Sequence, residues 1–346
     1  MIVPVPDTLE EALDPTWLTA ALGQRFPGTE VTAVTRTGET SRITTNVRFH
    51  IDCAGPVPEG LSSDLCVKGY FNDAGRQSRQ AGLPEALFYR DVADKTGMRT
   101  LRCVYAGVDL AAGNAVVITE DVIAQGGRFL DGTSEYSVEQ TASSLTELAQ
   151  LHGSTWDCAP RDAWLASRLG QTLEARGAPL IAENFAKPHG SAVPDSLRDA
   201  DRLVAAYRAV AARAHDVQPR CVIHGDTHVG NVFIAGDGRP SWLDWQVVQE
   251  GPWYVDVGYH IASALTVEDR RAHEDELLRH YLEQLAARGG EPLVLDEARA
   301  AIRQGMVHGF YFWAITVYVA PPIIASLLHR LGTAVEDHDA ITAALA

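Results

Sequence analysis

Positive charge is scarce in this chain of 346 residues, which carries 29 Lys and Arg against 45 Asp and Glu. The formal net charge of −16 repels polyanions, so we expect no nucleic-acid partner. A phosphate-bearing ligand would need positive charge concentrated at one point, which draws attention to any isolated lysine. Hydrophobic residues make up 46% and charged residues 21%, which is typical of a globular chain with a sizeable core.

Cysteine is sparse and shows no pairing pattern. The five cysteines are scattered, odd in number and without CxxC spacing: Cys53, Cys66, Cys103, Cys158 and Cys221. This distribution is typical of reduced thiols in a cytosolic protein. Residues 1–7 also lack a basic start followed by an apolar run, so the sequence predicts no export signal and a cytoplasmic location.

Long uninterrupted apolar segments are missing as well. Residues 305–328 are nearly all apolar, but Pro321 and Pro322 break the segment and His308 lies inside it. About sixteen residues remain before the break, whereas roughly twenty are needed to span a bilayer. We therefore predict a pair of buried helices here and no membrane partner.

Residue patterns divide the chain into a β-rich first third and a mainly helical remainder. Apolar spacing predicts helices over residues 8–26 and about 84–96. In the helical remainder, Ser137 and Gln140 fit a capping box, and the apolar face that follows carries His152, interpreted as a core histidine. Roughly alternating β-branched and aromatic residues predict strands at residues 31–34, 45–51, 65–71, 104–108 and 115–118.

The most informative segment contains two carboxylates and an amide near a predicted hairpin. Residues 232–235 and 240–243 are typical of two strands joined by a Gly-Asp-Gly-Arg turn. If the inner ends of these strands face each other, Asn231 lies opposite Asp244, with Cβ atoms roughly 4.5–5.5 Å apart. The segment reads His224-Gly225-Asp226-Thr227-His228-Val229-Gly230-Asn231, followed later by Leu243-Asp244-Trp245.

Two oxygen ligands at that spacing suit one Mg²⁺, which takes a few protein oxygens together with substrate phosphates and waters. Asp226, five residues before Asn231, is then free to meet a hydroxyl group. This combination is typical of a phosphoryl-transfer site.

Other interpretations of the segment remain open. Asp226 could belong to a turn in which it accepts backbone N–H bonds. His224 and His228, four residues apart, could form a zinc pair on a helix and indicate a metal hydrolase. Gly225 and Gly230 disfavour a helix, so His224 is interpreted as a buried histidine that braces the loop.

The pattern H-G-D-x4-N followed by L-D-W resembles the aminoglycoside phosphotransferase and choline-kinase-like group of small-molecule kinases. The Asp244-Trp245-Gln246 ending is most similar to its ecdysteroid-kinase-like branch. The resemblance implies an α+β fold that is bilobal and protein-kinase-like. Its β-rich N-lobe would be residues 1–122, and its mainly helical C-lobe residues 123–346.

The resemblance also implies roles in the C-lobe. Asp226 would be the catalytic aspartate, while Asn231 and Asp244 would hold Mg²⁺. Asp256 is similar to a family aspartate that braces the catalytic loop, and a helix N-cap is its alternative role. The short distance from Asp244 to Asp256 leaves no room for a long activation loop, which predicts a constitutively assembled site.

In the N-lobe, Lys68 stands on a predicted strand in a Val-Lys context. The resemblance implies that Lys68 binds the α- and β-phosphates of ATP and that Glu85 forms an ion pair with it. The alternatives are a solvated strand lysine and a glutamate that complements a helix dipole next to Pro84.

Two further N-lobe segments would contact the nucleotide. Gly38, Thr40 and Ser41 are assigned to the phosphate-covering loop, although this stretch has one glycine instead of G-x-G-x-x-G and could be an ordinary polar hairpin. Backbone groups around Glu120 and Val122 resemble the hinge that binds the adenine edge.

These features predict a kinase that transfers the γ-phosphate of ATP, with Mg²⁺, to a hydroxyl of a small-molecule alcohol. Aromatic residues near the C-terminus favour an apolar or bulky alcohol, with Trp245, Trp313 and Tyr318 as candidate contacts. The tail has few acidic residues, which disfavours an aminoglycoside-type antibiotic kinase. A nucleotide-binding pseudokinase or scaffold is the non-enzymatic alternative. Nothing in the sequence indicates the oligomeric state.

Overall fold

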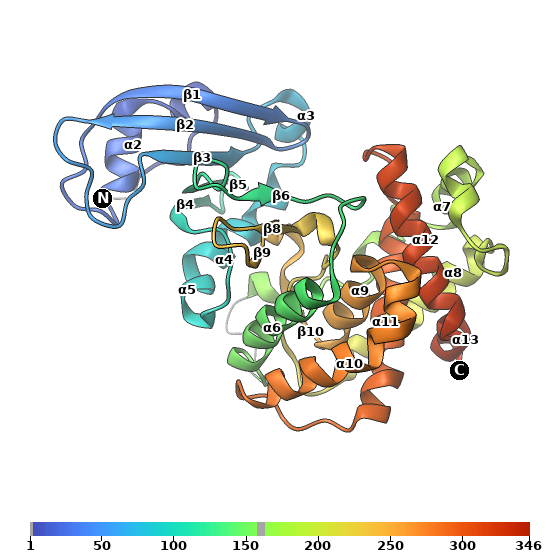
Figure 1. Ribbon diagram of the computed structural model, residues 1–346. Coiled ribbons are helices and arrows are strands. Elements are labelled where there is room, and N and C mark those ends of the chain that lie inside the picture. The colour runs from blue at the N-terminus through green and yellow to red at the C-terminus, as the bar shows by residue number, and fades with distance from the viewer. Residues whose placement is uncertain (1–2, 158–162) are drawn as a thin grey trace.

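The structure is a computed structural model that describes residues 3–157 and 163–346. A twisted antiparallel sheet with a few short helices forms the N-terminal part, and a larger helical part follows (Figure 1). This arrangement confirms the predicted α+β, bilobal kinase-like fold. The sheet has the strand order β1-β2-β3-β5-β4 and consists of β1 (Val31–Ser41), β2 (Thr45–Cys53), β3 (Asp64–Gly69), β4 (Cys103–Asp109) and β5 (Asn114–Glu120).

Alternation along the strands builds the first hydrophobic core. In β2, Val47, Phe49 and Ile51 are buried while the residues between them are more exposed, which is the pattern of a strand with one covered face. These side chains pack with Leu18 and Leu22 of helix α2 (Pro15–Leu22). We call this the N-terminal core; its buried residues lie between positions 12 and 118.

The prediction of one continuous helix over residues 8–26 is wrong. The structure has two helices there, α1 (Leu9–Ala12) and α2. Asp14 has extended backbone geometry and its side chain caps the first turn of α2, while Pro15 supplies no N–H to continue the earlier helix. The helix predicted over 84–96 is likewise divided, into α4 (Leu83–Asp91) and α5 (Ala93–Thr96). A further short helix, α3, covers Asp73–Arg76.

The helical part that follows the sheet contains eight α-helices among the described residues 3–157 and 163–346. The predicted capping box of Ser137 and Gln140 is present at the start of the first of them. The helices are α6 (Val138–Ser154), α7 (Ala178–Ala186), α8 (Ala200–Asp216), α9 (Tyr254–Ala264), α10 (Val267–Ala286), α11 (Leu295–Ala314), α12 (Pro321–Asp337) and α13 (Ala340–Leu345).

Helices α9 and α11 approach each other closely, and glycine makes this possible. A Cβ atom on Gly258 of α9 would lie 2.1 Å from the Ile302 carbonyl oxygen, and one on Gly305 of α11 would lie 2.3 Å from the Tyr254 carbonyl oxygen. Every residue of α9 is buried. The pair therefore forms a rigid support at the centre of the helical part.

The apolar segment 305–328 forms the end of α11 and the start of α12, which confirms the predicted pair of helices. Pro321 opens α12, at a position where its missing N–H costs little. Within the described parts of the chain, no helix combines the length and the apolar character that crossing a membrane would require. Cys53, Cys66 and Cys103 are free thiols, and Cys158 lies outside the described residues.

The predicted hairpin is present, but its register is one residue away from the prediction. Val232 pairs with Trp242 and Ile234 with Pro240, so Asn231 faces Leu243, whose N–H donates to the Asn231 carbonyl oxygen at 3.0 Å. The predicted pairing of Asn231 with Asp244 is wrong because the loop is shorter by one residue than assumed. The small strands are β6 (Arg128–Phe129), β8 (Val232–Ile234) and β9 (Pro240–Trp242) in one sheet, and β7 (Cys221–Ile223) and β10 (Gln249–Gly251) in another.

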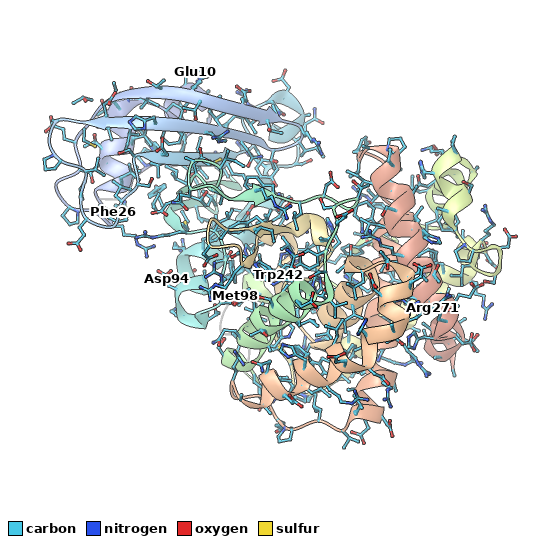
Figure 2. All side chains as sticks on the ribbon, viewed as in Figure 1. Glu10, Phe26, Asp94, Met98, Trp242 and Arg271 are labelled. Carbon is cyan, nitrogen blue, oxygen red and sulfur yellow. The ribbon has the colours of Figure 1, made fainter. Side chains whose placement is uncertain are left out.

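A second hydrophobic core fills the helical part and extends to helix α4. Trp242, near the middle of the molecule in Figure 2, is fully buried, and its indole N–H donates to the Ser144 carbonyl oxygen of α6 at 3.2 Å. Trp245 stacks on Phe88 of α4 with ring centroids 3.9 Å apart. We call this the C-terminal core; it joins α4 to the segment that follows the hairpin.

Candidate active site

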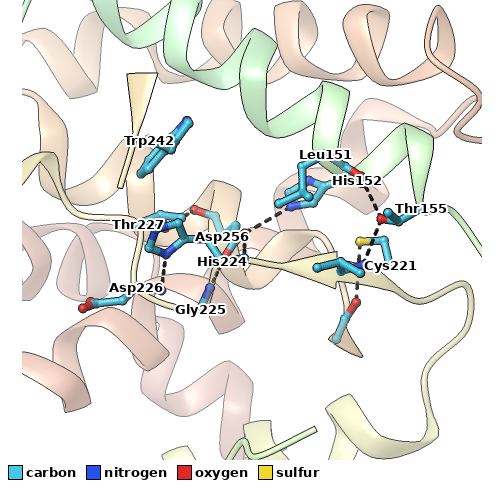
Figure 3. A network of polar contacts seen from close by, with 12 residues as sticks. Leu151, His152, Thr155, Cys221, His224, Gly225, Asp226, Thr227, Trp242 and Asp256 are labelled. Carbon is cyan, nitrogen blue, oxygen red and sulfur yellow. Dashed lines mark hydrogen bonds and ion pairs between the residues drawn. The ribbon is translucent and has the colours of Figure 1, made fainter. Parts of the chain in front are cut away.

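The loop after β7 is held to helix α9 by one buried carboxylate. The Asp256 side chain accepts the backbone N–H of His224 at 2.7 Å and that of Gly225 at 2.8 Å, and its backbone oxygen accepts the Thr227 hydroxyl at 2.8 Å (Figure 3). Asp256 lies inside α9 and is not its N-cap residue. It therefore occupies the position of a residue that braces the loop.

Two buried histidines complete this support (Figure 3). His152 contacts the Asp256 carboxylate at 3.1 Å and the Tyr281 hydroxyl at 2.8 Å, so it is a hydrogen-bonded core histidine as predicted. His224 accepts the Asp226 N–H at its Nδ1, and its Nε2 lies 2.9 Å from the Leu243 carbonyl oxygen. Burial raises the pKa of Asp256, but hydrogen bonding and charge from His152 outweigh it, and the pKa is lowered.

Asp226 lies at the end of this loop with its carboxylate held on two sides. Oδ1 accepts the Tyr259 hydroxyl at 2.9 Å, and Oδ2 accepts the Asn231 amide at 3.1 Å. Burial raises its pKa, but the nearby charge of His228, with contributions from His224 and the Tyr259 hydrogen bond, outweighs burial and lowers the pKa to about 2. Asp226 is therefore ionised at neutral pH and can accept a hydrogen bond from a hydroxyl.

Asn231 and Asp244 present oxygen atoms of the kind that Mg²⁺ prefers. The Asn231 amide nitrogen is used by the Asp226 carboxylate and backbone oxygen, which leaves its carbonyl oxygen for a ligand. Asp244 has a left-handed backbone, with φ of 65°, which is uncommon for a residue other than glycine and is often found at functional sites. Its Oδ1 contacts Lys68. Asn231 and Asp244 could supply part of the coordination of a metal ion, with phosphate oxygens and waters supplying the rest. They are too few to coordinate the ion alone.

The zinc interpretation finds no support in the same region. His224 and His228 do not lie on an α-helix, since the segment is a loop followed by a short 3₁₀ turn, Val229–Asn231. Among residues 3–157 and 163–346, no group of three or more His, Cys, Asp or Glu side chains is arranged to hold a metal ion.

Lys68 joins the N-terminal sheet to the loop that follows the hairpin. Its Nζ lies 2.7 Å from Glu85 Oε2 and 2.9 Å from Asp244 Oδ1. Burial lowers the pKa of Lys68, but the two carboxylates outweigh it and raise the pKa, so the side chain stays protonated. The ion pair with Glu85 that the resemblance implies is present, and Glu85 is buried on α4.

A cavity of about 370 Å³ extends from Lys68 and Asp244 to the end of β5. Its volume lies in the range of small-ligand sites. Asp226 is not among the residues that line it. The cavity is lined by the predicted residues Thr40, Lys68, Glu85, Glu120, Val122 and Asp244, and also by Arg48, Leu101, Val117, Thr119 and Phe129.

The predicted phosphate-covering loop is only partly correct. Strand β1 continues to Ser41, so residues 38–41 belong to a strand and the turn lies at residues 42–44. Thr40 lines the cavity, whereas Gly38 lies opposite Arg48 beside a β-bulge, away from the cavity lining. Ser41 hydrogen-bonds Thr45 at 3.1 Å and does not line the cavity.

The three candidate acceptor contacts lie in different environments. Trp245 is wrong as an acceptor contact, because its ring is fully buried against Phe88. Tyr318 lies in the connection between α11 and α12. Its side chain is 80% exposed, so it does not line an enclosed site. Trp313 is also buried, but it lies near Asp226, because its indole N–H donates to the Tyr259 hydroxyl at 2.7 Å and Tyr259 donates to Asp226.

Sequence reasoning missed Tyr259 and His228 as neighbours of Asp226. His228 Nε2 lies 3.7 Å from Asp226 Oδ2, and its ring contacts Trp313 edge-on with centroids 5.1 Å apart. Tyr259 could have been found from its spacing, because it follows Asp256 by three residues on one helix and must share its face.

Comparison with known proteins identifies the class first. The fold is that of small-molecule kinases: an ethanolamine kinase from Plasmodium vivax is similar at 13% identity and a TM-score of 0.53, over 87% of this chain and 81% of that one. A choline/ethanolamine kinase family protein from Mesorhizobium loti is similar at 16% identity and a TM-score of 0.51, over 97% of both chains. At such identities the likeness shows the fold alone.

The family follows from the sequence itself. The chain belongs to the ecdysteroid kinase-like family, whose model matches residues 83–289. The match includes α4 with Glu85, the loop with Asp226 and Asn231, and Asp244. No curated protein matches the sequence significantly. Family and fold together support a small-molecule kinase or phosphotransferase.

Proposed function

We propose that this protein transfers the γ-phosphate of ATP to a hydroxyl group of a small molecule, with Mg²⁺ as cofactor. The observation that carries the proposal is the 2.9 Å contact between Lys68 and Asp244, two residues separated by 176 positions in the chain. It brings the proposed phosphate-binding cation of the sheet to the proposed metal-binding carboxylate of the helical part. Such convergence from both sides of a cleft is what phosphoryl transfer requires.

Lys68 would neutralise the non-transferred phosphates, with Glu85 holding the lysine in place. Mg²⁺ bound by Asn231 and Asp244 would offset the charge on the phosphates. Asp226 would orient the acceptor hydroxyl and accept its proton as the new oxygen–phosphorus bond forms and the bond from the γ-phosphorus to the departing ADP breaks. Because Asp226 has a low pKa, its contribution is chiefly orientation and electrostatics, which suits a reaction governed by positioning.

The adenine end of ATP would lie beside Glu120 and Val122. The Glu120 N–H already donates to the Arg102 carbonyl oxygen at 2.9 Å, and the Asp121 N–H to that of Asp64 at 3.0 Å. The Val122 N–H is therefore the hinge donor we assign to the base. The same cavity is lined by Val122 at this hinge and by Lys68, so one nucleotide could contact both, and we place the lobe boundary after Val122.

The acceptor would be an apolar or bulky small-molecule alcohol. His228 and Tyr259 flank the carboxylate of Asp226, and Trp313 contacts both of them, so the side chains around this carboxylate are largely aromatic. Of the three, the partly exposed His228 is the one we assign to the acceptor. Two of the three acidic residues of the tail are engaged elsewhere: Asp337 pairs with Arg270 and Arg271, and Glu336 accepts the Ser196 hydroxyl. Their engagement supports the preference against a polycationic aminoglycoside.

The test is consumption of Mg-ATP across a panel of hydroxylated compounds, namely sterols, macrolides, hydroxyacyl compounds and aminoglycosides, with product masses measured. Asp226→Asn should lower turnover by about 10²–10⁴-fold while leaving ATP binding nearly intact, because the amide keeps the shape but cannot accept the proton. Asp195→Asn, which changes an exposed carboxylate, is the control and should match wild type.

Equal turnover in Asp226→Asn and wild type would contradict the assigned role. Binding of Mg-ATP with neither transfer nor hydrolysis would instead favour a pseudokinase or scaffold. Activity with tightly bound zinc and without ATP would favour a metal hydrolase.

A further inference from the structure

We propose that Tyr259 and Trp313 are positioning residues that act through Asp226. They form a hydrogen-bond relay that occupies one carboxylate oxygen and turns the other toward the acceptor hydroxyl. The proposal rests on the proposed function, because it assigns the orientation of the same catalytic carboxylate.

The chemistry of the three groups determines the direction of the relay. The indole N–H of Trp313 can only donate, so the Tyr259 oxygen is the acceptor in the 2.7 Å contact between them. The phenol has a single proton, which must then point to Asp226 Oδ1 at 2.9 Å. Burial and the charge of Asp226 raise the pKa of Tyr259, so the phenol remains a donor.

The packing of α9 against α11 fixes both members of the relay. Tyr259 is fully buried on α9, and Trp313 is nearly so on α11. Gly309, one turn before Trp313, leaves room for the tyrosine ring: a Cβ atom there would lie 2.4 Å from Tyr259 Cδ2. The relay is thus built into the contact between two helices and does not depend on a mobile loop.

The other oxygen of Asp226 faces a more open environment. Asn231 donates to Oδ2 at 3.1 Å, and His228 Nε2 lies 3.7 Å away, beyond direct hydrogen-bond distance. His228 Nδ1 accepts the Gly230 N–H at 3.0 Å, so in the neutral ring the proton is on Nε2, toward Asp226. The fully buried Tyr259 covers Oδ1, while the Asp226 side chain as a whole is 28% exposed. The acceptor therefore approaches from the side of Oδ2.

The test compares Tyr259→Phe and Trp313→Phe with Tyr254→Phe, which removes a buried hydroxyl from the same helix. Slow Mg-ATP hydrolysis, with water as acceptor, and the best alcohol of the panel are the two reactions. Tyr259→Phe should lower kcat by about tenfold to a hundredfold, since it removes a hydrogen bond to a charged group. Trp313→Phe should lower kcat by about two- to tenfold, and KM for Mg-ATP should change less than twofold in both.

A second measurement does not depend on turnover. In protein labelled with ¹⁵N-tryptophan, the Trp313 indole signal, assigned by its loss in Trp313→Phe, should shift in Tyr259→Phe and in Asp226→Asn. It should stay unchanged in Tyr254→Phe.

The outcomes separate the two proposals. If wild type consumes no ATP with water or any alcohol, the proposed function fails, and the indole signal alone then decides whether the relay exists. If wild type is active but Tyr259→Phe keeps kcat within twofold of Tyr254→Phe, the relay is overturned while the kinase assignment stands. An indole signal insensitive to Tyr259→Phe overturns the relay in either case.

Discussion

Lys68 shows how the role of a single residue depends on the side chains that the fold places next to it. On its strand it could have been a solvated side chain, yet its Nζ lies between the carboxylates of Glu85 and Asp244. Without this cation, the buried carboxylate of Glu85 next to the partly exposed Asp244 would be costly, because like charges repel strongly in a poorly solvated environment. The lysine is therefore needed both by the site and by its surroundings.

We expect Lys68→Met to lower kcat/KM for Mg-ATP by about tenfold to a hundredfold, because charge-assisted hydrogen bonds to phosphate are lost. Steady-state kinetics at varied Mg-ATP measure the effect. Lys95→Met, on the exposed side of α5, removes the same charge and should behave as wild type. Similar losses in both variants would show that overall charge, and not the cleft position, is responsible.

Helix α9 is the element on which the site is built. It carries three residues that contact the loop. Asp256 accepts hydrogen bonds from the loop backbone, Tyr259 donates to the Asp226 carboxylate, and His260 contacts the Thr227 carbonyl oxygen. His260 also contacts Ser144 of α6 at 2.6 Å. Burial lowers the pKa of His260 to about 4, so this ring is neutral in the folded protein.

This low pKa makes stability depend on pH. As pH falls below about 6.5, His260 takes up a proton in the unfolded chain, but in the folded protein it does so only near pH 4. The unfolded state therefore binds more protons in this window, and the free energy of unfolding decreases from pH 6.5 toward pH 4. Denaturant unfolding at pH 7 and pH 5 should show a smaller decrease for His260→Gln than for wild type.

His273→Gln, which changes a more exposed histidine of α10, serves as the control and should keep the wild-type pH dependence. An unchanged pH dependence in His260→Gln would mean that other buried histidines, such as His308, account for the effect.

At the scale of the whole molecule, the cavity lies between the N-terminal sheet and the segment of Leu243 and Asp244 that follows the hairpin. The N-terminal core and the C-terminal core are separate clusters, although α4 belongs to the second. A nucleotide bound between them would contact both and stabilise the folded state as a whole. Asp244 is the residue through which a metal would add to this stabilisation.

We expect Mg-ATP at a hundred times its Kd to raise the free energy of unfolding by about 2.7 kcal/mol. Asp244→Ala should lose most of the part that depends on Mg²⁺, because one of two proposed metal ligands is removed. Thermal unfolding with ATP, with and without Mg²⁺, measures the difference, and Asp195→Ala is the exposed control. A full Mg²⁺-dependent shift in Asp244→Ala would rule out this ligand.

Prediction from sequence succeeded where the signal was local. The alternation of β2 and the capping box of Ser137 depend on residues close in the chain, and both are present as expected. The division of the first helix is also a local signal, because Asp14 caps α2 and Pro15 is its first residue. The predicted hairpin register is wrong because the number of residues in the loop sets the register. The pattern of apolar residues in the strands does not reveal that number.

Prediction of the site failed where burial decides the role. Trp245 carries the same ring as Trp313, yet one packs on Phe88 and the other meets Tyr259. Nothing in the sequence around either residue distinguishes these environments. The difference arises from which helix packs against each ring.

By itself, the sequence determined the β-rich first third, the mainly helical remainder and the chemical groups of the loop that carries Asp226, because periodicity, turns and motif spacing are properties of neighbouring residues. Only the tertiary structure decided that Lys68 meets Asp244 and that Trp313, Tyr259 and Asp226 form one chain of hydrogen bonds. These contacts join segments far apart in the chain, and the packing of the sheet and helices, not local preference, brings them together.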